Sequence, residues 1–130
     1  MWGRHLVLDC SAGEREAVCD GRVIREFCGD LVSAIGMVAY GKPTLEHFAA
    51  HLPEAAGYSL VQLIETSAVT GHFCDSSGDI YLDIFSCKDF DPEVAIEVVR
   101  RYFRPESVHR IDLFRSASEP ARDEGLKLSV

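Results

Sequence analysis

Two short apolar segments constrain the fold of this chain more than any other feature. Residues 58–65 (YSLVQLIE) and 79–87 (DIYLDIFSC) are rich in aliphatic and aromatic side chains, a composition typical of β-strands. The sequence DSSG at 75–78 has the residues of a turn and precedes the second segment. We therefore predict two strands here, with a sheet at the centre of the fold.

Two helices are predicted to accompany this sheet. Apolar residues recur at helical spacing over residues 20–35, and Gly36 is a suitable stop for that helix. Asp91 is a good N-cap for a second helix, and Pro92 suits its first position because no backbone donor is needed there. The remaining extended segments are residues 4–10, 37–48 and 108–115.

The predicted order is β-α-β-β-β-α-β, in which both helices can pack on one face of the sheet. This is an α+β fold, a two-layer α/β sandwich with a mainly antiparallel sheet. Alternation over residues 59–65 leaves both sheet faces partly apolar, so dimerisation through the open face or an edge would bury the uncovered one. We predict a single domain over residues 1–116 and a polar, flexible tail over residues 117–130.

Length and charge exclude several classes of function. The chain has 130 residues, which suits one domain, and its formal net charge of −8 makes nucleic acid a poor partner. A small cationic substrate would be electrostatically favoured. No apolar run approaches the roughly 18 residues that span a bilayer, and the N-terminus lacks the apolar core of a signal peptide. We expect a cytoplasmic protein that binds neither nucleic acid nor membrane.

The five cysteines show neither the pattern of a disulfide framework nor that of a zinc site. Their number is odd, no CxxC occurs, and a cytosolic setting argues against disulfides. The clustered Cys and His spacing of a zinc site is also missing, so no metal is predicted. We interpret Cys10, Cys19 and Cys28 as small buried hydrophobic residues or free thiols.

Residues 65–73 (ETSAVTGHF) lie between the two apolar segments and carry more reactive side chains than a plain turn needs. Asn-Gly or Asp-Gly would make a simpler hairpin. A serine in a tight connection can attack the carbonyl before it, here Thr66, and form an ester. If a base then removes the α-proton of Ser67, elimination breaks the chain, and hydrolysis leaves a pyruvoyl group.

This reaction also needs a nearby base and hydroxyl donors for the carbonyl oxygen. His72 is the candidate base because its unperturbed pKa lies near neutrality, and Ser59 and Thr70 are candidate hydroxyls. Cys87 ends the next predicted strand, where a hairpin can return it beside Ser67. The simpler interpretation is a connection whose polar residues are solvated or cap neighbouring elements.

Short motifs extend this pattern along the chain: GRH at 3–5, GYS at 57–59, Ser67 with His72 five residues later, DIFSC at 83–87, and Asp91-Pro92 at a helix start. On these motifs the chain resembles the short prokaryotic S-adenosylmethionine decarboxylase proenzymes, which are pyruvoyl-dependent carboxy-lyases. The resemblance covers most of residues 3–115 and has no internal shift from residue 57 to residue 87.

The resemblance implies a role for each reactive residue. Ser67 becomes the pyruvoyl group after autocatalytic cleavage of the Thr66–Ser67 bond, and it then forms a Schiff base with the substrate amine. His72 is the processing base and Ser59 assists processing. Cys87 donates a proton to the substrate after decarboxylation. Family members form dimers of two-layer protomers, which implies a homodimer, or a dimer of cleaved αβ protomers.

Two stretches depart from the family pattern. Residues 66–68 read Thr-Ser-Ala where the family has Glu-Ser-His, and residues 72–76 read HFCDS where it has His-Thr-Trp-Pro-Glu. The substrate therefore stays open between S-adenosylmethionine, for spermidine and polyamine synthesis, and arginine or ornithine. A further alternative is an unprocessed, non-catalytic homologue that binds a ligand or partner.

Several side chains near these stretches have two interpretations. Glu65 and Phe73 are candidate substrate contacts, with a solvated carboxylate and a core ring as the simpler alternatives. Asp83 is similarly a candidate contact for a cationic substrate or a hydrogen-bonded carboxylate. His5 and His47 are interpreted as structural residues.

Overall fold

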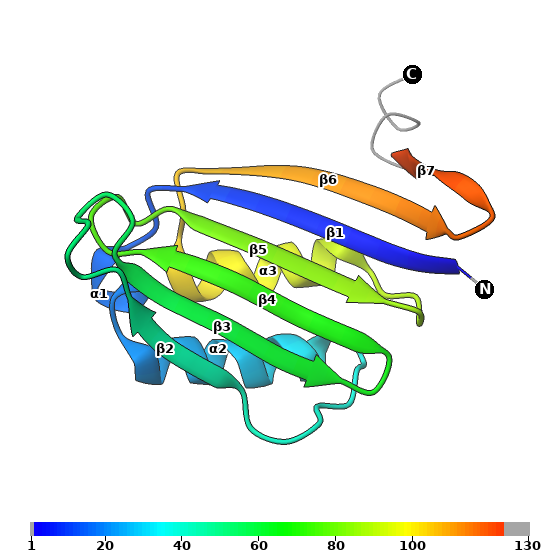
Figure 1. The fold of residues 1–130 in the computed structure, drawn as a ribbon, viewed down its shortest axis with the longest axis horizontal. Helices are drawn as coiled ribbons and strands as arrows, with labels where there is room; N and C mark the ends of the chain where they lie inside the picture. Colours follow the sequence, from blue (N-terminus) through cyan, green and yellow to red (C-terminus); the bar gives the residue numbers. More distant parts are fainter. Residues whose placement is uncertain (1, 124–130) are drawn as a thin grey trace.

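An antiparallel sheet forms the centre of the fold (Figure 1), and the computed structural model describes it over residues 2–123. Its strands are β1 (Trp2–Ser11), β2 (Thr44–Phe48), β3 (Gly57–Ile64), β4 (Ser67–Cys74), β5 (Ile80–Ser86), β6 (Ser107–Ser116) and β7 (Glu119–Asp123). The helices are α1 (Arg15–Val18), α2 (Gly21–Ala34) and α3 (Pro92–Phe103). The strand order across the sheet is β2-β3-β4-β5-β1-β6-β7.

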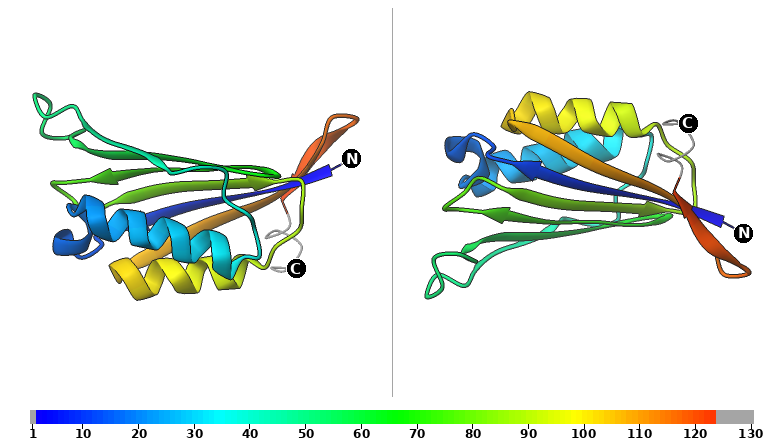
Figure 2. Two further views of the ribbon diagram at one scale, coloured as in Figure 1. Left: turned by 90° about the horizontal axis from the view of Figure 1, so that it is seen from below. Right: turned by 90° about the horizontal axis from the view of Figure 1, so that it is seen from above.

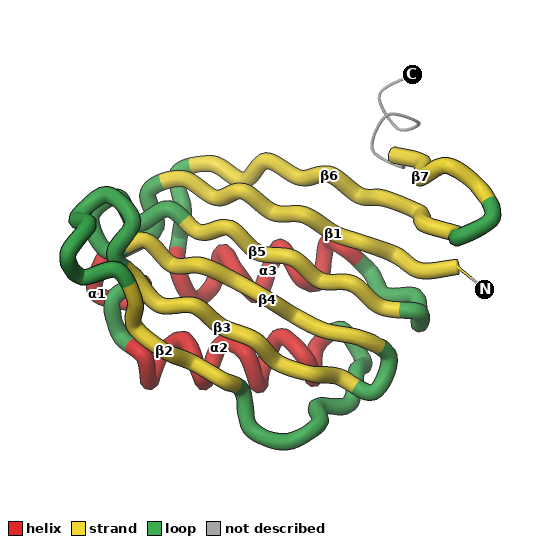
Figure 3. The backbone as a smooth tube through the Cα atoms, in the orientation of Figure 1, coloured by secondary structure: helices red, strands yellow, loops and turns green. Residues whose placement is uncertain are grey.

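Hairpins and two helical crossovers produce this order. Strands β2 to β5 follow one another as an antiparallel meander, and β1 then pairs with both β5 and β6. The chain crosses from β1 to β2 through α1 and α2, and from β5 to β6 through α3. The β3–β4 hairpin and the end of β5 therefore lie at the end of the sheet where β1 begins (Figure 3).

Capping explains where the long helices start and stop. The Asp20 carboxylate accepts a hydrogen bond from the Arg22 amide at 2.9 Å, and the Asp91 carboxylate accepts one from Glu93 at the same distance. Arg104 ends α3 in a left-handed conformation with φ of 43°. The structure confirms both predicted long helices, and it confirms Asp91 and Pro92 as the start of the second.

The helices cover one face of the sheet and leave the other uncovered (Figure 2). Inward side chains of α2, α3 and the central strands form a continuous core, in which Phe27, Phe73 and Phe103 are fully buried and contact one another. Burying a side chain of this size contributes on the order of 1.5–3 kcal/mol. The predicted two-layer α+β sandwich is confirmed.

The open face carries several large hydrophobic side chains. They come from strands β3, β5 and β6 and are between 43% and 52% exposed: Val61, Leu63, Tyr81 and Ile111. None of the helices within residues 2–123 has the length and apolar composition needed to cross a membrane.

Two strands were not foreseen in the sequence. Residues 67–74 form β4, where a connection was expected, because Gly71 and the polar residues of its open face obscure the strand alternation. Residues 119–123 form β7 against β6, inside the segment expected to be a flexible tail, and residues 124–130 lie outside the described part. Within the extended segment 37–48, only Thr44–Phe48 is a strand.

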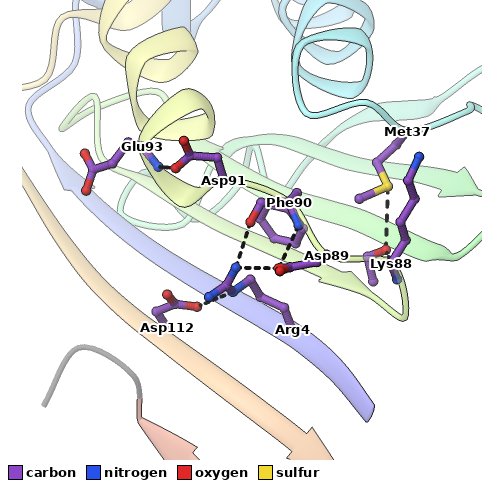
Figure 4. Close-up of polar contacts among 9 residues, drawn as sticks. Arg4, Met37, Lys88, Asp89, Phe90, Asp91, Glu93 and Asp112 are labelled. Atoms are coloured by element: carbon purple, nitrogen blue, oxygen red, sulfur yellow. Dashed lines mark hydrogen bonds and ion pairs between the residues drawn. The ribbon is translucent and has the colours of Figure 1, made fainter. Parts of the chain in front are cut away.

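Arg4 ties the start of α3 to the sheet (Figure 4). Its guanidinium donates to the Asp112 carboxylate at 3.0 Å and to the Phe90 carbonyl oxygen at 2.8 Å, and it also pairs with Asp89. Asp112 is almost fully buried, so this pair supplies the charge partner that its burial requires. The contact holds the segment after β5 against β1 and β6.

Candidate active site

The Thr66–Ser67 bond lies in the hairpin between β3 and β4. Ile64 and Ser67 are cross-strand partners, so only Glu65 and Thr66 form the loop. Two-residue hairpins favour type I′ or II′ turns, which require a positive φ at the first loop residue. Neither Glu65 nor Thr66 has a positive φ. The loop therefore lacks the backbone conformation that matches the twist of the two flanking strands in a two-residue hairpin.

Neighbouring segments hold this loop in place. The Glu65 amide donates to the Val38 carbonyl oxygen at 2.9 Å, and the Cys87 amide donates to the Thr66 carbonyl oxygen at 3.1 Å. The Thr66 and Ser86 hydroxyl oxygens lie 2.7 Å apart. The carbonyl that Ser67 would attack thus already accepts a hydrogen bond from the main chain of the adjacent strand.

Cys87 follows β5 directly and is brought beside the loop, as its place in the sequence suggested. Its thiol is exposed and borders an open hollow of about 380 Å³ that Gly3, Phe85 and Arg115 also line. The Arg115 guanidinium lies 4.7 Å from the centre of the Phe85 ring, within the range of a cation–π contact. The two side chains together form part of the wall of the hollow. None of Glu65, Thr66 and Ser67 lines this hollow, so it adjoins the Cys87 side of the hairpin and not the Thr66–Ser67 bond itself.

Ser59 and His72 meet each other across β3 and β4, toward the opposite end of the sheet. The Ser59 hydroxyl oxygen lies 3.1 Å from His72 Nδ1, and His72 Nε2 lies 3.1 Å from the Ala55 carbonyl oxygen. A carbonyl oxygen can only accept, so Nε2 carries a proton. In the neutral form of the ring, Nδ1 keeps a lone pair to which the Ser59 hydroxyl can donate.

One protomer does not bring His72 to Ser67. The two residues are five positions apart in the same strand, which separates them by about 17 Å at about 3.3 Å per residue. An odd separation also puts their side chains on opposite faces, with Ser67 on the side of Val69 and Phe73. The expectation that His72 acts on Ser67 within one chain is therefore not supported by the geometry.

The other residues predicted to take part in the site do not lie together at the hairpin. Phe73 is 0% exposed and packs between Phe27 and Phe103, so it cannot touch a substrate, and the core interpretation replaces the substrate-binding one. Glu65 is exposed on the hairpin loop. Thr70 lies opposite Asp83 in the sheet register, away from the Thr66–Ser67 bond.

Two histidine–aspartate pairs lie outside the hairpin. His5 Nε2 is 3.0 Å from an Asp83 carboxylate oxygen, and His47 Nε2 is 2.6 Å from an Asp75 carboxylate oxygen. The His47 ring also packs edge-on against Tyr58, with ring centres 5.1 Å apart. Within residues 2–123, no three His, Cys, Asp or Glu side chains are grouped so that they could share a metal ion.

Cys10, Cys28 and Cys74 are buried, whereas Cys19 and Cys87 are exposed. Burial raises the pKa of Cys10 and of Cys28 to about 11, so both stay protonated near neutral pH. The pKa of Cys74 and that of Cys19 are also raised, chiefly by burial and then by nearby aspartates. Of the two interpretations given for Cys10, Cys19 and Cys28, the buried one holds for Cys10 and Cys28, and the free thiol is the one that fits the exposed Cys19.

A family model described as S-adenosylmethionine decarboxylase matches residues 4–116. The chain belongs to this family. The match includes the hairpin, the Ser59–His72 pair and Cys87, and it reaches the end of β6. Among curated proteins, no sequence matches the chain.

A solved structure supports the same fold. The chain is similar to the crystal structure of the adenosylmethionine decarboxylase from Aquifex aeolicus VF5, with a TM-score of 0.70 and 18% sequence identity. The similarity covers 85% of this chain and 87% of that one. The seven-stranded antiparallel sheet with its helices is therefore a decarboxylase-family fold.

Sequence reasoning missed the role of Ser86 beside the hairpin. The residue is fully buried, and its hydroxyl oxygen contacts the Thr66 hydroxyl while accepting a hydrogen bond from the Lys88 amide at 2.9 Å. The only signal for it in the sequence was its place directly before Cys87 in DIFSC. Without the pairing of β4 with β5, that signal does not connect Ser86 to Thr66.

Proposed function

We propose that this chain is a self-processing, pyruvoyl-dependent decarboxylase that acts on S-adenosylmethionine and feeds polyamine synthesis. Membership of the S-adenosylmethionine decarboxylase family supports the decarboxylase assignment. The observation that carries the processing step is the hydrogen bond from the Cys87 amide to the Thr66 carbonyl oxygen, next to Ser67.

Self-cleavage begins with attack of Ser67 Oγ on the Thr66 carbonyl carbon. The new C–O bond forms, the C–N bond to Ser67 breaks, and the hydroxyl proton passes to the released nitrogen, which leaves an ester. Negative charge grows on the Thr66 oxygen during this attack. The Cys87 amide, at 3.1 Å, is positioned to stabilise that charge.

Removal of the α-proton of Ser67 then breaks the chain. The Thr66 carboxylate leaves, Ser67 becomes dehydroalanine, and addition of water with loss of ammonia gives the pyruvoyl group. This step requires a base at the Ser67 α-carbon. His72 has a lone pair on Nδ1 and a Ser59 hydroxyl beside it, but it lies about 17 Å away along its own strand.

In a homodimer, the base and the nucleophile can come from different chains, so the distance between His72 and Ser67 within one chain no longer matters. The Ser59–His72 pair shares the open face with the exposed hydrophobic residues of β3, β5 and β6, so a second copy packed there would bury those residues. Such packing can deliver the partner's His72 to the hairpin. The atom to be reached is the Ser67 α-carbon, and main-chain atoms of a strand can be approached from either face of a sheet.

The residues around the hairpin suit the group that cleavage would create. A pyruvoyl carbonyl supplies an electron sink for loss of the substrate carboxyl group. Cys87 can deliver a proton to the substrate α-carbon from the rim of the hollow, and Phe85 offers an aromatic surface there. Glu65, exposed on the loop, provides a carboxylate near a cationic substrate.

Arginine or ornithine is the second candidate substrate. The residues at 74 and 76 are Cys and Ser where the family has Trp and Glu, and Phe73 is enclosed in the core. An aromatic contact for adenine would then have to come from another residue, such as Phe85. A substrate without an adenine ring would not need that contact.

Carbon dioxide release separates these alternatives. Cleaved protein is incubated with carboxyl-labelled S-adenosylmethionine, arginine or ornithine, with a Ser67→Ala variant as the uncleaved control. Release from S-adenosylmethionine alone supports the proposal. Release from arginine or ornithine instead would refute the substrate assignment, and a wild-type chain that stays full length would refute the enzyme and leave a ligand- or partner-binding homologue.

A further inference from the structure

We propose that the hydroxyls of Thr66 and Ser86 form a clamp that orients the Thr66–Ser67 peptide for self-attack, with Ser86 as the positioning residue. The inference rests on the proposed self-cleavage and adds a device that sets its rate. It follows from three properties of the hairpin: its turn geometry, the anchoring of Ser86, and the two-point attachment of Thr66.

The turn needs an external support. Its two loop residues have no positive φ, so it is neither of the two turn types whose twist matches the flanking strands. Contacts with residues 37, 38, 86 and 87 must therefore determine how the Thr66–Ser67 peptide is presented. The contacts with Ser86 and with the Met37 sulfur are the ones made through the Thr66 hydroxyl, at 2.7 Å and 3.5 Å.

Ser86 is anchored well enough to act as that support. It is 0% exposed, and its hydroxyl accepts from the Lys88 amide at 2.9 Å and lies 3.6 Å from the Met37 sulfur. The Lys88 ammonium in turn donates to the Gly36 carbonyl oxygen at 2.8 Å, just after α2 (Figure 4 shows Lys88 beside Met37). The 86–88 segment is thus fastened both to the sheet and to the end of a helix.

Thr66 is consequently held at two points. Its carbonyl oxygen accepts from the Cys87 amide at 3.1 Å, and its hydroxyl contacts Ser86 Oγ at 2.7 Å and the Met37 sulfur at 3.5 Å. One hydrogen bond leaves the residue free to rotate about it, whereas two attachments restrict both the side chain and the carbonyl. Thr66 is also β-branched, so its χ1 is restricted, and fixing its hydroxyl fixes the main chain as well.

This restriction matters because the attack depends on orientation. Ser67 Oγ must approach one face of the Thr66 carbonyl, and a small misplacement of reacting groups can cost on the order of 100-fold in rate. Thr66 stands where the family has glutamate, so the hydroxyl contact is a feature of this chain's own cleavage site. The clamp therefore provides the orientation that the turn itself does not.

The test follows cleavage of pulse-labelled, full-length chain made by cell-free synthesis. Ser86→Ala and Thr66→Val each remove one hydroxyl, and each should slow cleavage by about 10-fold or more. The Ser86→Thr variant restores a hydroxyl and should cleave at close to the wild-type rate. Combining Ser86→Ala with Thr66→Val should cost little more than either change alone, because both break the same contact.

A matched control separates positioning from stability. Ser11 and Ser107 form a similar hydroxyl pair, 2.5 Å apart, at the other end of the sheet. Ser11→Ala should leave the cleavage rate unchanged, and it should lower the melting temperature less than Ser86→Ala because Ser11 is only partly buried. Should Ser86→Ala not fold, Thr66→Val, which keeps the side-chain volume, decides the question.

Each outcome bears on one claim. Slow cleavage in both hydroxyl variants at a temperature where they are folded supports the clamp. Wild-type rates in both variants would overturn it while leaving self-cleavage intact. A wild-type chain that never cleaves overturns the proposed function, and the clamp with it.

Discussion

Complementation between two inactive variants tests whether the processing site is shared between subunits. Ser67 and His72 are about 17 Å apart in one strand, so a chain cannot supply both groups to its own site. Ser67→Ala lacks the nucleophile and His72→Ala lacks the base, so neither variant should cleave by itself. When they are produced together, a hybrid dimer has one complete site, made from Ser67 of one chain and the partner's His72.

The expected yield follows from pairing. If the chains associate at random, about half of the dimers are hybrids, and each hybrid completes one site out of two. About one quarter of all chains should then be cleaved, and every cut chain should be the His72→Ala one. Wild-type chains should be cleaved almost completely under the same conditions.

Two different affinity tags identify which chain is cut on a denaturing gel. A control co-production of Ser67→Ala with the double variant Ser67→Ala/His72→Ala should give no fragments, because no Ser67 remains. Cleavage of His72→Ala produced alone would show that His72 is not the base. Absence of fragments from the mixed dimers, with dimers present on a sizing column, would contradict the shared site.

Three further perturbations test individual parts of the account. Cys87→Ala should leave cleavage intact, because the main-chain amide at Thr66 remains, but should reduce carbon dioxide release at least tenfold; full turnover would refute the proton-donor role. Phe73→Ala should destabilise the fold by about 3–5 kcal/mol in denaturant titration because the ring is fully buried, and a loss below about 1 kcal/mol would contradict its core placement. Since burial raises the pKa of Cys10 and Cys28 from 9.0 to about 11, the folded thiols hold protons that the unfolded chain releases, so stability should fall as pH rises from 9 to 11; a flat melting temperature there would contradict the burial.

Local signals in the sequence were enough to predict the layers of the fold. The N-cap at Asp91, Pro92 at the first helical position and the apolar spacing of α2 act over a few residues, so they can be identified without a structure. The apolar segments of β3 and β5 are similarly self-contained. These elements define an antiparallel sheet with helices on one face.

The arrangement of the site depended on pairings that local signals do not carry. Residues 67–74 read as a polar connection, because only Val69, Phe73 and Cys74 are buried in β4, and a compact connection would have kept Ser67 near His72. As a strand, the same residues separate the two groups. The Thr66–Ser86 contact likewise depends on the register of β4 with β5, which pairs Ser67 with Ser86.

Intact mass measurement of the purified protein shows whether the chain cuts itself between Thr66 and Ser67. We predict two fragments, residues 1–66 ending in a free Thr66 carboxylate and residues 67–130 beginning with a pyruvoyl group. That second fragment should be about 17 Da lighter than a peptide starting with serine, because ammonia is lost, and it should resist N-terminal sequencing. A single full-length mass, or a second fragment with an ordinary serine at its start, would contradict self-processing at this bond.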